Sequence, residues 1–142
     1  MQPGLLRRIE RHREVLEKLC KLVRLLRGRL ARLALVLYGS YARGDFNAWS
    51  DVDVILVWEG FGSKRLPERH AVLRDVLSSV DEPLELIPWT PREAELMLRK
   101  PTWRKALQDC LVFADDYGIF TGLCRRAECD GEKRREPQNG RS

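Results

Sequence analysis

Apolar residues recur at alternating spacings of four and three over residues 5–30. This spacing places them on one face of a long helix, while arginine, lysine and glutamate occupy the other positions. The same spacing fits a helix packed on its own sheet or a coiled-coil dimer, and we favour packing within the chain. The stripe consists of Leu5, Ile9, Leu16, Leu19, Val23, Leu26 and Leu30, with His12 interrupting it.

Beyond this helix, continuous apolar runs alternate with segments of helical spacing. Strands are predicted at residues 33–38, 52–58, 84–87 and 111–114, and helices at 66–80, 90–99 and 102–109. Pro88 is expected to end the third strand, and Thr90 to cap the helix that follows it. This order of elements predicts an α/β fold with about four strands packed against helices.

Composition indicates a globular chain: of its 142 residues, 44% are hydrophobic and 33% are charged. The longest apolar run, residues 33–38, is far shorter than the roughly 20 residues that span a bilayer. The first residues lack an apolar signal-peptide core, so we expect a cytoplasmic protein. The four cysteines form no C-x-x-C pair, which argues against a zinc or redox motif and favours reduced thiols.

Charge is distributed unevenly along the chain. Residues 1–32 contain ten Lys/Arg and three Glu, while the middle of the chain is acidic. Because the candidate chemistry lies in the acidic part, nucleic-acid binding is not expected despite the net charge of +5. Residues 125–142 contain almost no apolar side chains, so we expect a single folded domain over residues 1–124 and a disordered basic tail over 125–142.

Two aspartates at the start of the second predicted strand carry the first chemical signal. Asp51 and Asp53 are two residues apart, so their carboxylates point to the same face of a strand. Adjacent carboxylates repel each other, and a bound divalent cation with a preference for oxygen, Mg²⁺ or Mn²⁺, relieves that repulsion.

A phosphate-binding turn is the second signal. Gly39 follows a buried strand, and Ser40 opens a turn whose backbone N–H groups and hydroxyl suit a phosphate. Arg43 lies one turn further on and could add a guanidinium to phosphate oxygens. Glu85 is the only charge in the third predicted strand, where it is either a third site carboxylate or a solvent-facing residue.

These residues together resemble a known family. The pattern Gly39-Ser40-x10-Asp51-x-Asp53, with Ala42-Arg43-Gly44 after the serine and Ser50 before the first aspartate, is similar to the nucleotidyltransferase superfamily that includes DNA polymerase β. The short chain resembles the minimal nucleotidyltransferases of bacteria and archaea. The resemblance implies a small mixed four-stranded sheet with helices packed on one side.

It also implies transfer of a nucleotidyl group, typically AMP from ATP, to an acceptor hydroxyl. Gly39 and Ser40 would hold the outgoing phosphates, with Arg43 and Ser50 as further nucleotide-binding residues. Asp51, Asp53 and Glu85 would be the catalytic carboxylates and the ligands of two Mg²⁺ ions.

Many minimal members of the superfamily act as antitoxins of HEPN-domain proteins. The resemblance therefore implies a HEPN partner, adenylylated on a tyrosine, and a possible homo- or hetero-oligomer. Two alternatives stay open: a non-catalytic antitoxin that masks its partner, and a small-molecule nucleotidyltransferase. Relatives of the second kind usually carry a substrate-binding domain that 142 residues do not hold, and no membrane association is expected.

Overall fold

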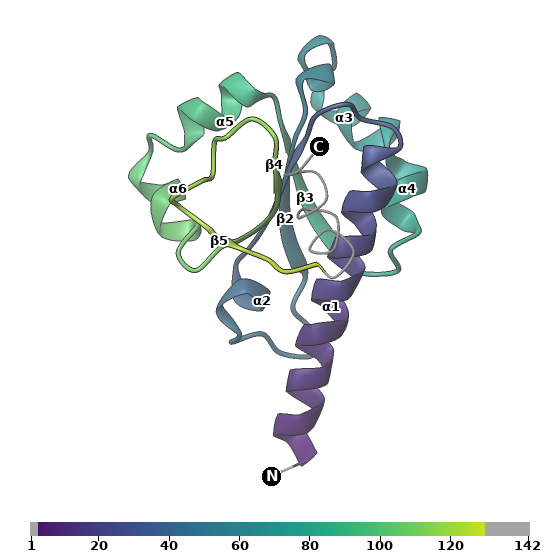
Figure 1. The fold of residues 1–142 in the computed structure, drawn as a ribbon, viewed down its shortest axis with the longest axis vertical. Helices are drawn as coiled ribbons and strands as arrows, with labels where there is room; N and C mark the ends of the chain where they lie inside the picture. The colour runs from purple at the N-terminus through teal and green to yellow at the C-terminus, as the bar shows by residue number, and fades with distance from the viewer. Residues whose placement is uncertain (1–2, 130–142) are drawn as a thin grey trace, which may run out of the picture.

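A mixed five-stranded sheet of order β3-β2-β1-β4-β5 forms the centre of the computed structural model, which describes residues 3–129 (Figure 1). Strand β1 is antiparallel to β2 and β4, whereas β3 is parallel to β2 and β5 is parallel to β4. The strands are β1 (Ala34–Tyr38), β2 (Val52–Val57), β3 (Leu84–Trp89), β4 (Leu111–Asp115) and β5 (Arg125–Arg126). The predicted α/β class is confirmed, with β5 added to the four expected strands.

The helices also follow the predicted order, with one interruption. They are α1 (Pro3–Arg27), α2 (Ser40–Arg43), α3 (Leu66–Val72), α4 (Arg74–Ser78), α5 (Pro91–Met97) and α6 (Pro101–Ala106), with a 3-10 turn η1 (Glu59–Ser63). The single helix expected over residues 66–80 is two helices, because the backbone at Leu73 (φ −117°, ψ 18°) leaves the helical region. No helix within residues 3–129 is long and apolar enough to span a membrane.

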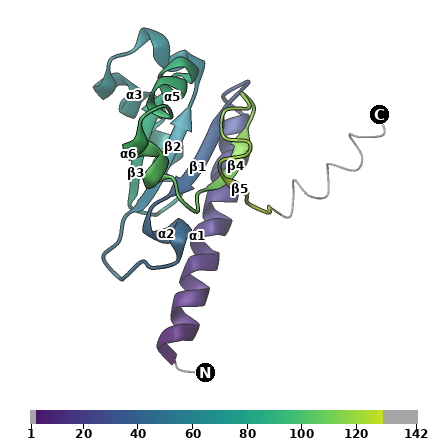
Figure 2. The same ribbon diagram turned by 90° about the vertical axis from the view of Figure 1, so that its left-hand side faces the viewer.

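Helices cover both faces of the sheet, which corrects the expectation that they pack on one side. The alternation of side chains along each strand produces two separate apolar layers. Leu35, Val54 and Leu56 pack with α1 and α4 on one face. Val36 and Ile55 face the other way, toward α5, α6 and the segment after β4. Both views of the ribbon show α1 and α6 on opposite sides of the sheet (Figure 2).

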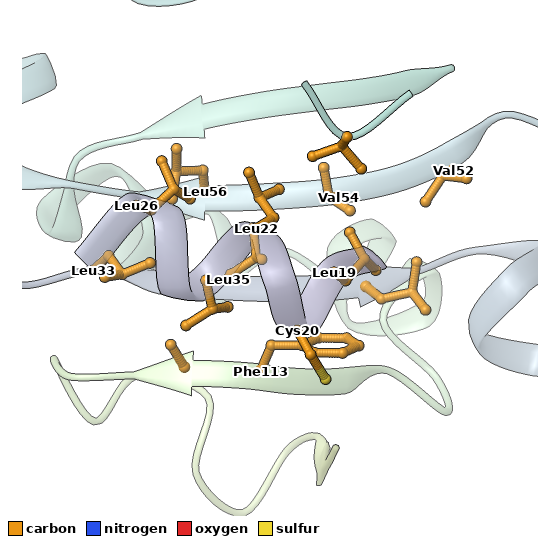
Figure 3. Packing of buried hydrophobic residues seen from close by; sticks show 14 of the residues in the cluster. Leu19, Cys20, Leu22, Leu26, Leu33, Leu35, Val52, Val54, Leu56 and Phe113 are labelled. Carbon is orange, nitrogen blue, oxygen red and sulfur yellow. The ribbon is translucent and has the colours of Figure 1, made fainter. Parts of the chain in front are cut away.

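Helix α1 packs on its own sheet, as favoured above. Leu19, Leu22 and Leu26 are almost fully buried and point toward Leu35 and Leu56 of the central strands (Figure 3). The first turns of α1 extend beyond the sheet, where Leu5, Leu6 and Ile9 are about half exposed, at 48, 46 and 50%. The C-terminal half of α1 therefore contributes to the core, and the N-terminal half presents apolar side chains to solvent.

Two disulfides contradict the expectation of reduced thiols. Cys20 of α1 is bonded to Cys129, and Cys110 before β4 is bonded to Cys124. The first pair is 109 residues apart in the chain, a contact that depends on how β5 returns to α1 and that spacing along the chain does not reveal.

The boundary predicted at residue 124 is therefore too early. Arg125 and Arg126 pair with β4, and Cys129 is buried against α1. Pairing to a strand edge requires only backbone groups, so the polar composition of this segment does not prevent it. Residues 130–142 of the predicted tail lie outside the described part of the chain.

Candidate active site

The Gly-Ser turn packs closely against the neighbouring strand β2 because Gly39 has no side chain. Gly39 ends β1 with φ +78°, a left-handed conformation that favours glycine. A Cβ atom at this position would overlap Oδ2 of Asp53 and lie 3.2 Å from its Cγ. Glycine is therefore required here, and it lets the Asp53 carboxylate lie directly against the turn.

After this turn the chain forms the short helix α2. The Arg43 N–H donates to the Gly39 carbonyl at 3.0 Å, and Gly44 ends the helix in a left-handed conformation. The N–H groups of Ser40 and the next two residues precede the first hydrogen bond of α2, as at any helix start. These backbone donors and the partly exposed Ser40 directly follow Gly39, which lies against the Asp53 carboxylate.

Strand register brings two of the three predicted carboxylates together. Asp53 of β2 pairs with Glu85 of the parallel strand β3, so the two side chains lie on the same face. Asp51, two residues before Asp53 and just outside β2, is exposed. Burial raises the pKa of Asp53, and the negative charges of Glu85 and Asp51 raise it further, while Arg43 opposes the shift.

The donor set fits a divalent cation that prefers oxygen. Within residues 3–129, no three His, Cys, Asp or Glu side chains lie close enough to form a ready metal cluster. The carboxylates of Asp53, Glu85 and Asp51 nevertheless act on one another electrostatically, and a cation would offset that mutual repulsion. Carboxylate oxygens alone suit Mg²⁺ or Mn²⁺ rather than zinc.

Arg43 and Ser50 take less direct places than the pattern implied. The Arg43 guanidinium pairs with the Asp45 carboxylate at 3.1 Å on the surface, although its charge still reaches Asp53. The Ser50 hydroxyl oxygen accepts from the Asn47 N–H at 2.9 Å and braces the loop before Asp51. In this structure, therefore, Ser50 holds the loop in shape, and Arg43 influences the site through its charge.

Tyr38 is a site residue that the sequence reasoning missed. It pairs with Asp53 across the antiparallel strands, and its ring packs edge-on against Trp103 of α6 at 5.6 Å. Burial, followed by the charges of Asp53 and Glu85, raises the pKa of Tyr38 to about 12. The phenol therefore remains protonated at neutral pH, beside the carboxylates. Its position directly before Gly39 is the signal that could have revealed it.

A second missed feature supports the start of β3. The Glu82 side chain, only 2% exposed, is bonded to the Arg11 guanidinium at 2.5 and 2.8 Å and to the Lys18 ammonium at 2.8 Å. Burial would raise the pKa of Glu82, but the hydrogen bonds from Arg11 and Lys18 outweigh it and lower that pKa. These ion pairs attach the segment just before β3 to α1 and so help to hold the start of β3 in the register that pairs Glu85 with Asp53.

Comparisons with known proteins agree with this geometry. The sequence model of the nucleotidyltransferase domain family matches residues 12–115, a segment that includes the Gly-Ser turn, Tyr38 and the three carboxylates. The chain therefore belongs to the nucleotidyltransferase domain family.

Individual relatives are more distant. The chain is 40% identical over 45 residues to "Putative protein adenylyltransferase MJ1305" of Methanocaldococcus jannaschii, covering 32% of this chain and 30% of that protein. A crystal structure of "a putative nucleotidyltransferase from Sulfolobus solfataricus" superimposes with a TM-score of 0.55 at 21% identity, covering 75% of this chain and 85% of the other. The structural likeness shows the shared fold.

Proposed function

We propose that the chain transfers AMP from ATP to a hydroxyl group of a protein. The observation that carries the proposal is the close approach of Gly39 to Asp53, with Glu85 paired to Asp53 on the next strand. A phosphate-binding turn thereby adjoins a set of carboxylates. The adenylyltransferase name of the Methanocaldococcus relative supports AMP as the transferred group.

In this proposal the turn residues and the carboxylates have separate roles. Gly39 and Ser40 bind the phosphates that leave, and Asp51, Asp53 and Glu85 are the residues that would hold Mg²⁺. When bound, the metal neutralises phosphate charge and lowers the barrier to in-line displacement. Glu85, at the outer side of the pair, accepts the proton of the acceptor hydroxyl. The protonated Tyr38 stays neutral beside these acids and adds no further negative charge.

A HEPN-domain protein is the partner that we propose, with one of its tyrosines as the acceptor and antitoxin action as the result. The N-terminal half of α1 supports docking of a protein, because Leu5, Leu6 and Ile9 are exposed among several arginines. Trp49, in the loop before Asp51, is 92% exposed, and residues 46–48 of the same loop line a cleft together with Arg7 and Arg8 of α1. Exposed apolar side chains of this size commonly mark protein interfaces.

Nucleotide binding is tested first, by isothermal titration with ATP and Mg²⁺. Wild type should bind, and Asp51→Asn/Asp53→Asn should bind at least about tenfold more weakly because the carboxylates that neutralise the metal are gone. Glu59→Gln is the matched control: it removes an exposed charge just past the C-terminal end of β2, whereas Asp53 lies near the start of that strand.

Transfer is then tested with ATP labelled on the α-phosphate and the purified HEPN-domain partner. Label on a partner tyrosine with wild type, and none with Asp53→Asn, would support the enzyme. Stable binding of the partner without label would instead support the non-catalytic antitoxin, and binding of neither ATP nor partner would refute both.

A further inference from the structure

Strand β3 is an edge strand that is free along one side. In the sheet order its only neighbour is β2. The N–H of Val52 donates to the Pro83 carbonyl and that of Trp58 to the Trp89 carbonyl, both at 3.0 Å. In a parallel ladder alternate residues face the neighbour, so the odd-numbered residues face β2. The N–H and C=O groups of Leu84 and Leu86 therefore point outward, where no group within residues 3–129 pairs with them.

The free part of this edge is short and is closed at its C-terminal end. Near the C-terminal end of β3, Pro88 has no N–H, and its carbonyl accepts from the Arg69 guanidinium at 3.2 Å. Arg69 is itself held by the Glu93 carboxylate at 2.6 Å. The open backbone groups are thus those around Glu85, the third site carboxylate.

A cleft of about 380 Å³ runs along this open edge. Its inner wall is Leu84, Glu85 and Leu86, and its outer wall comes from α3 and α4 with His70 and Arg74. Glu82, which also lines it, is already neutralised by its two cations. A cleft beside an unpaired strand edge has room for backbone groups to pair with the edge, while polar side chains meet the flanking residues.

We infer that the acceptor is an extended polypeptide segment that adds as a strand to the free edge of β3. The inference rests on the proposed function and names its substrate class. A residue opposite Glu85 in the added strand has its side chain on the same face as Glu85, with Cβ atoms about 5 Å apart. That face carries Asp53 and Tyr38 as well, so strand addition delivers a hydroxyl side chain to the carboxylates.

The transfer balances with the groups named. The acceptor oxygen forms a bond to the α-phosphorus of ATP, and the bond from that phosphorus to the bridging oxygen of the β-phosphate breaks. Pyrophosphate leaves with the electron pair, and the hydroxyl proton goes to the Glu85 carboxylate. The product is an AMP ester of the hydroxyl, and no oxidant or reductant is required.

A second copy of the chain is a poorer occupant of this edge. A symmetric antiparallel pairing of two β3 strands centred on Glu85 places two carboxylates directly opposite each other, which is destabilising. An acceptor strand with a hydroxyl residue at that position has no such repulsion. Self-association through β3 is therefore an outcome that the experiment must distinguish.

The probe is a blocked nonapeptide with one central tyrosine among alternating threonine and valine residues, incubated with full-length protein, Mg²⁺ and α-labelled ATP. Two further peptides carry backbone N-methyl groups, one at the tyrosine and every second residue, the other at the intervening residues. Strand addition predicts that one methylated peptide loses about tenfold or more in transfer rate and the other does not, because only alternate N–H groups meet β3. Equal effects of both methylations would overturn the inference.

Leu86→Pro tests the protein side, since it removes an outward N–H and no bond to β2. It should lower transfer to the peptide about tenfold while ATP binding is unchanged. Leu86→Ala, which keeps the N–H, is the matched control. If the two variants behave alike, or if Leu86→Pro converts a dimer to a monomer by light scattering, the edge does not bind an acceptor strand. Loss of ATP binding in wild type would instead refute the proposed function itself.

Discussion

Replacing Glu85 with glutamine tests whether the paired acids form one site. The change keeps size and removes one of the charges that raise the pKa of Asp53. Asp53 is half-buried and Glu85 is exposed, and two carboxylates about 6 Å apart in such surroundings repel by about 1 kcal/mol at an effective dielectric constant near 50. Without metal, Glu85→Gln should therefore be more stable than wild type by about 1 kcal/mol, or about 2–4 °C in melting temperature for a chain of this length.

Magnesium should reverse this order. A cation bound only by the native state stabilises it by RT ln(1 + [L]/Kd), which is about 1.4 kcal/mol at ten times Kd. Wild type should gain most of this stabilisation, whereas Glu85→Gln should gain less because one ligand is missing. In transfer assays the variant should lose orders of magnitude in rate while ATP binding survives through Asp51 and Asp53.

The assay is a pair of melting curves for each protein, with EDTA and with 10 mM Mg²⁺, followed by transfer from labelled ATP. Glu59→Gln serves again as a control for loss of an exposed charge at the opposite end of β2 from Asp53. If Glu85→Gln melts no higher than wild type in EDTA and still transfers AMP at the wild-type rate, the carboxylates do not act as one site. The assignment of Glu85 would then be wrong.

Acidity provides an independent check on the same electrostatics. The pKa of Asp53 in the folded protein is raised above its ordinary value of 3.8. The folded state therefore binds this proton more tightly than the unfolded state does. The stability that the proton contributes is fully present below pH 3.8 and is lost as the pH rises through the folded pKa. Asp53→Asn should accordingly stabilise the metal-free protein at pH 7, and the gain should shrink as the pH falls toward 4.

Three further predictions concern the scaffold. Cys20→Ala/Cys129→Ala should lower the free energy of unfolding by about 4–5 kcal/mol, because this disulfide closes a loop of 109 residues. Removing the disulfide between Cys110 and Cys124, which closes a shorter loop, should cost about 3 kcal/mol. Denaturant titration under non-reducing conditions measures both losses. Gly39→Ala should cost about 1–3 kcal/mol through its positive φ and the overlap with Asp53, and it should abolish ATP binding in calorimetry. Glu82→Gln should destabilise by about 1–3 kcal/mol at pH 7; since the pKa of Glu82 is lowered, the difference from wild type should shrink as the pH falls below its ordinary value of 4.5.

Local patterns predicted most of the fold because each strand and helix carries its own periodicity. The run at residues 84–87 predicted a strand, and the alternation of its residues placed Glu85 opposite in direction to Leu84 and Leu86. Pro88 was expected to end that strand, but β3 continues to Trp89. The physical reason is that Pro88 points away from β2, so its missing N–H removes no bond of the ladder.

Contacts between distant segments could not be predicted in this way. The bond between Cys20 and Cys129 and the burial of Glu82 between two cations of α1 depend on tertiary packing. Tyr38 was read as the last apolar residue of a strand, and only its register with Asp53 shows that its phenol adjoins the carboxylates. The motif predicted which residues belong to the site, whereas their arrangement in three dimensions depends on the register of the sheet.

The position of Glu85 explains why the third acid lies in the edge strand. A carboxylate in β1 or β2 has strands on both sides, so an acceptor can approach it only from above the sheet. Glu85 has Asp53 on one side and an open edge on the other. In the proposed reaction, ATP at the Gly-Ser turn and an acceptor at the edge would therefore reach the same carboxylates from different directions. An edge strand is normally a risk for aggregation, and here Pro88 and Arg69 close the edge on the C-terminal side of Glu85.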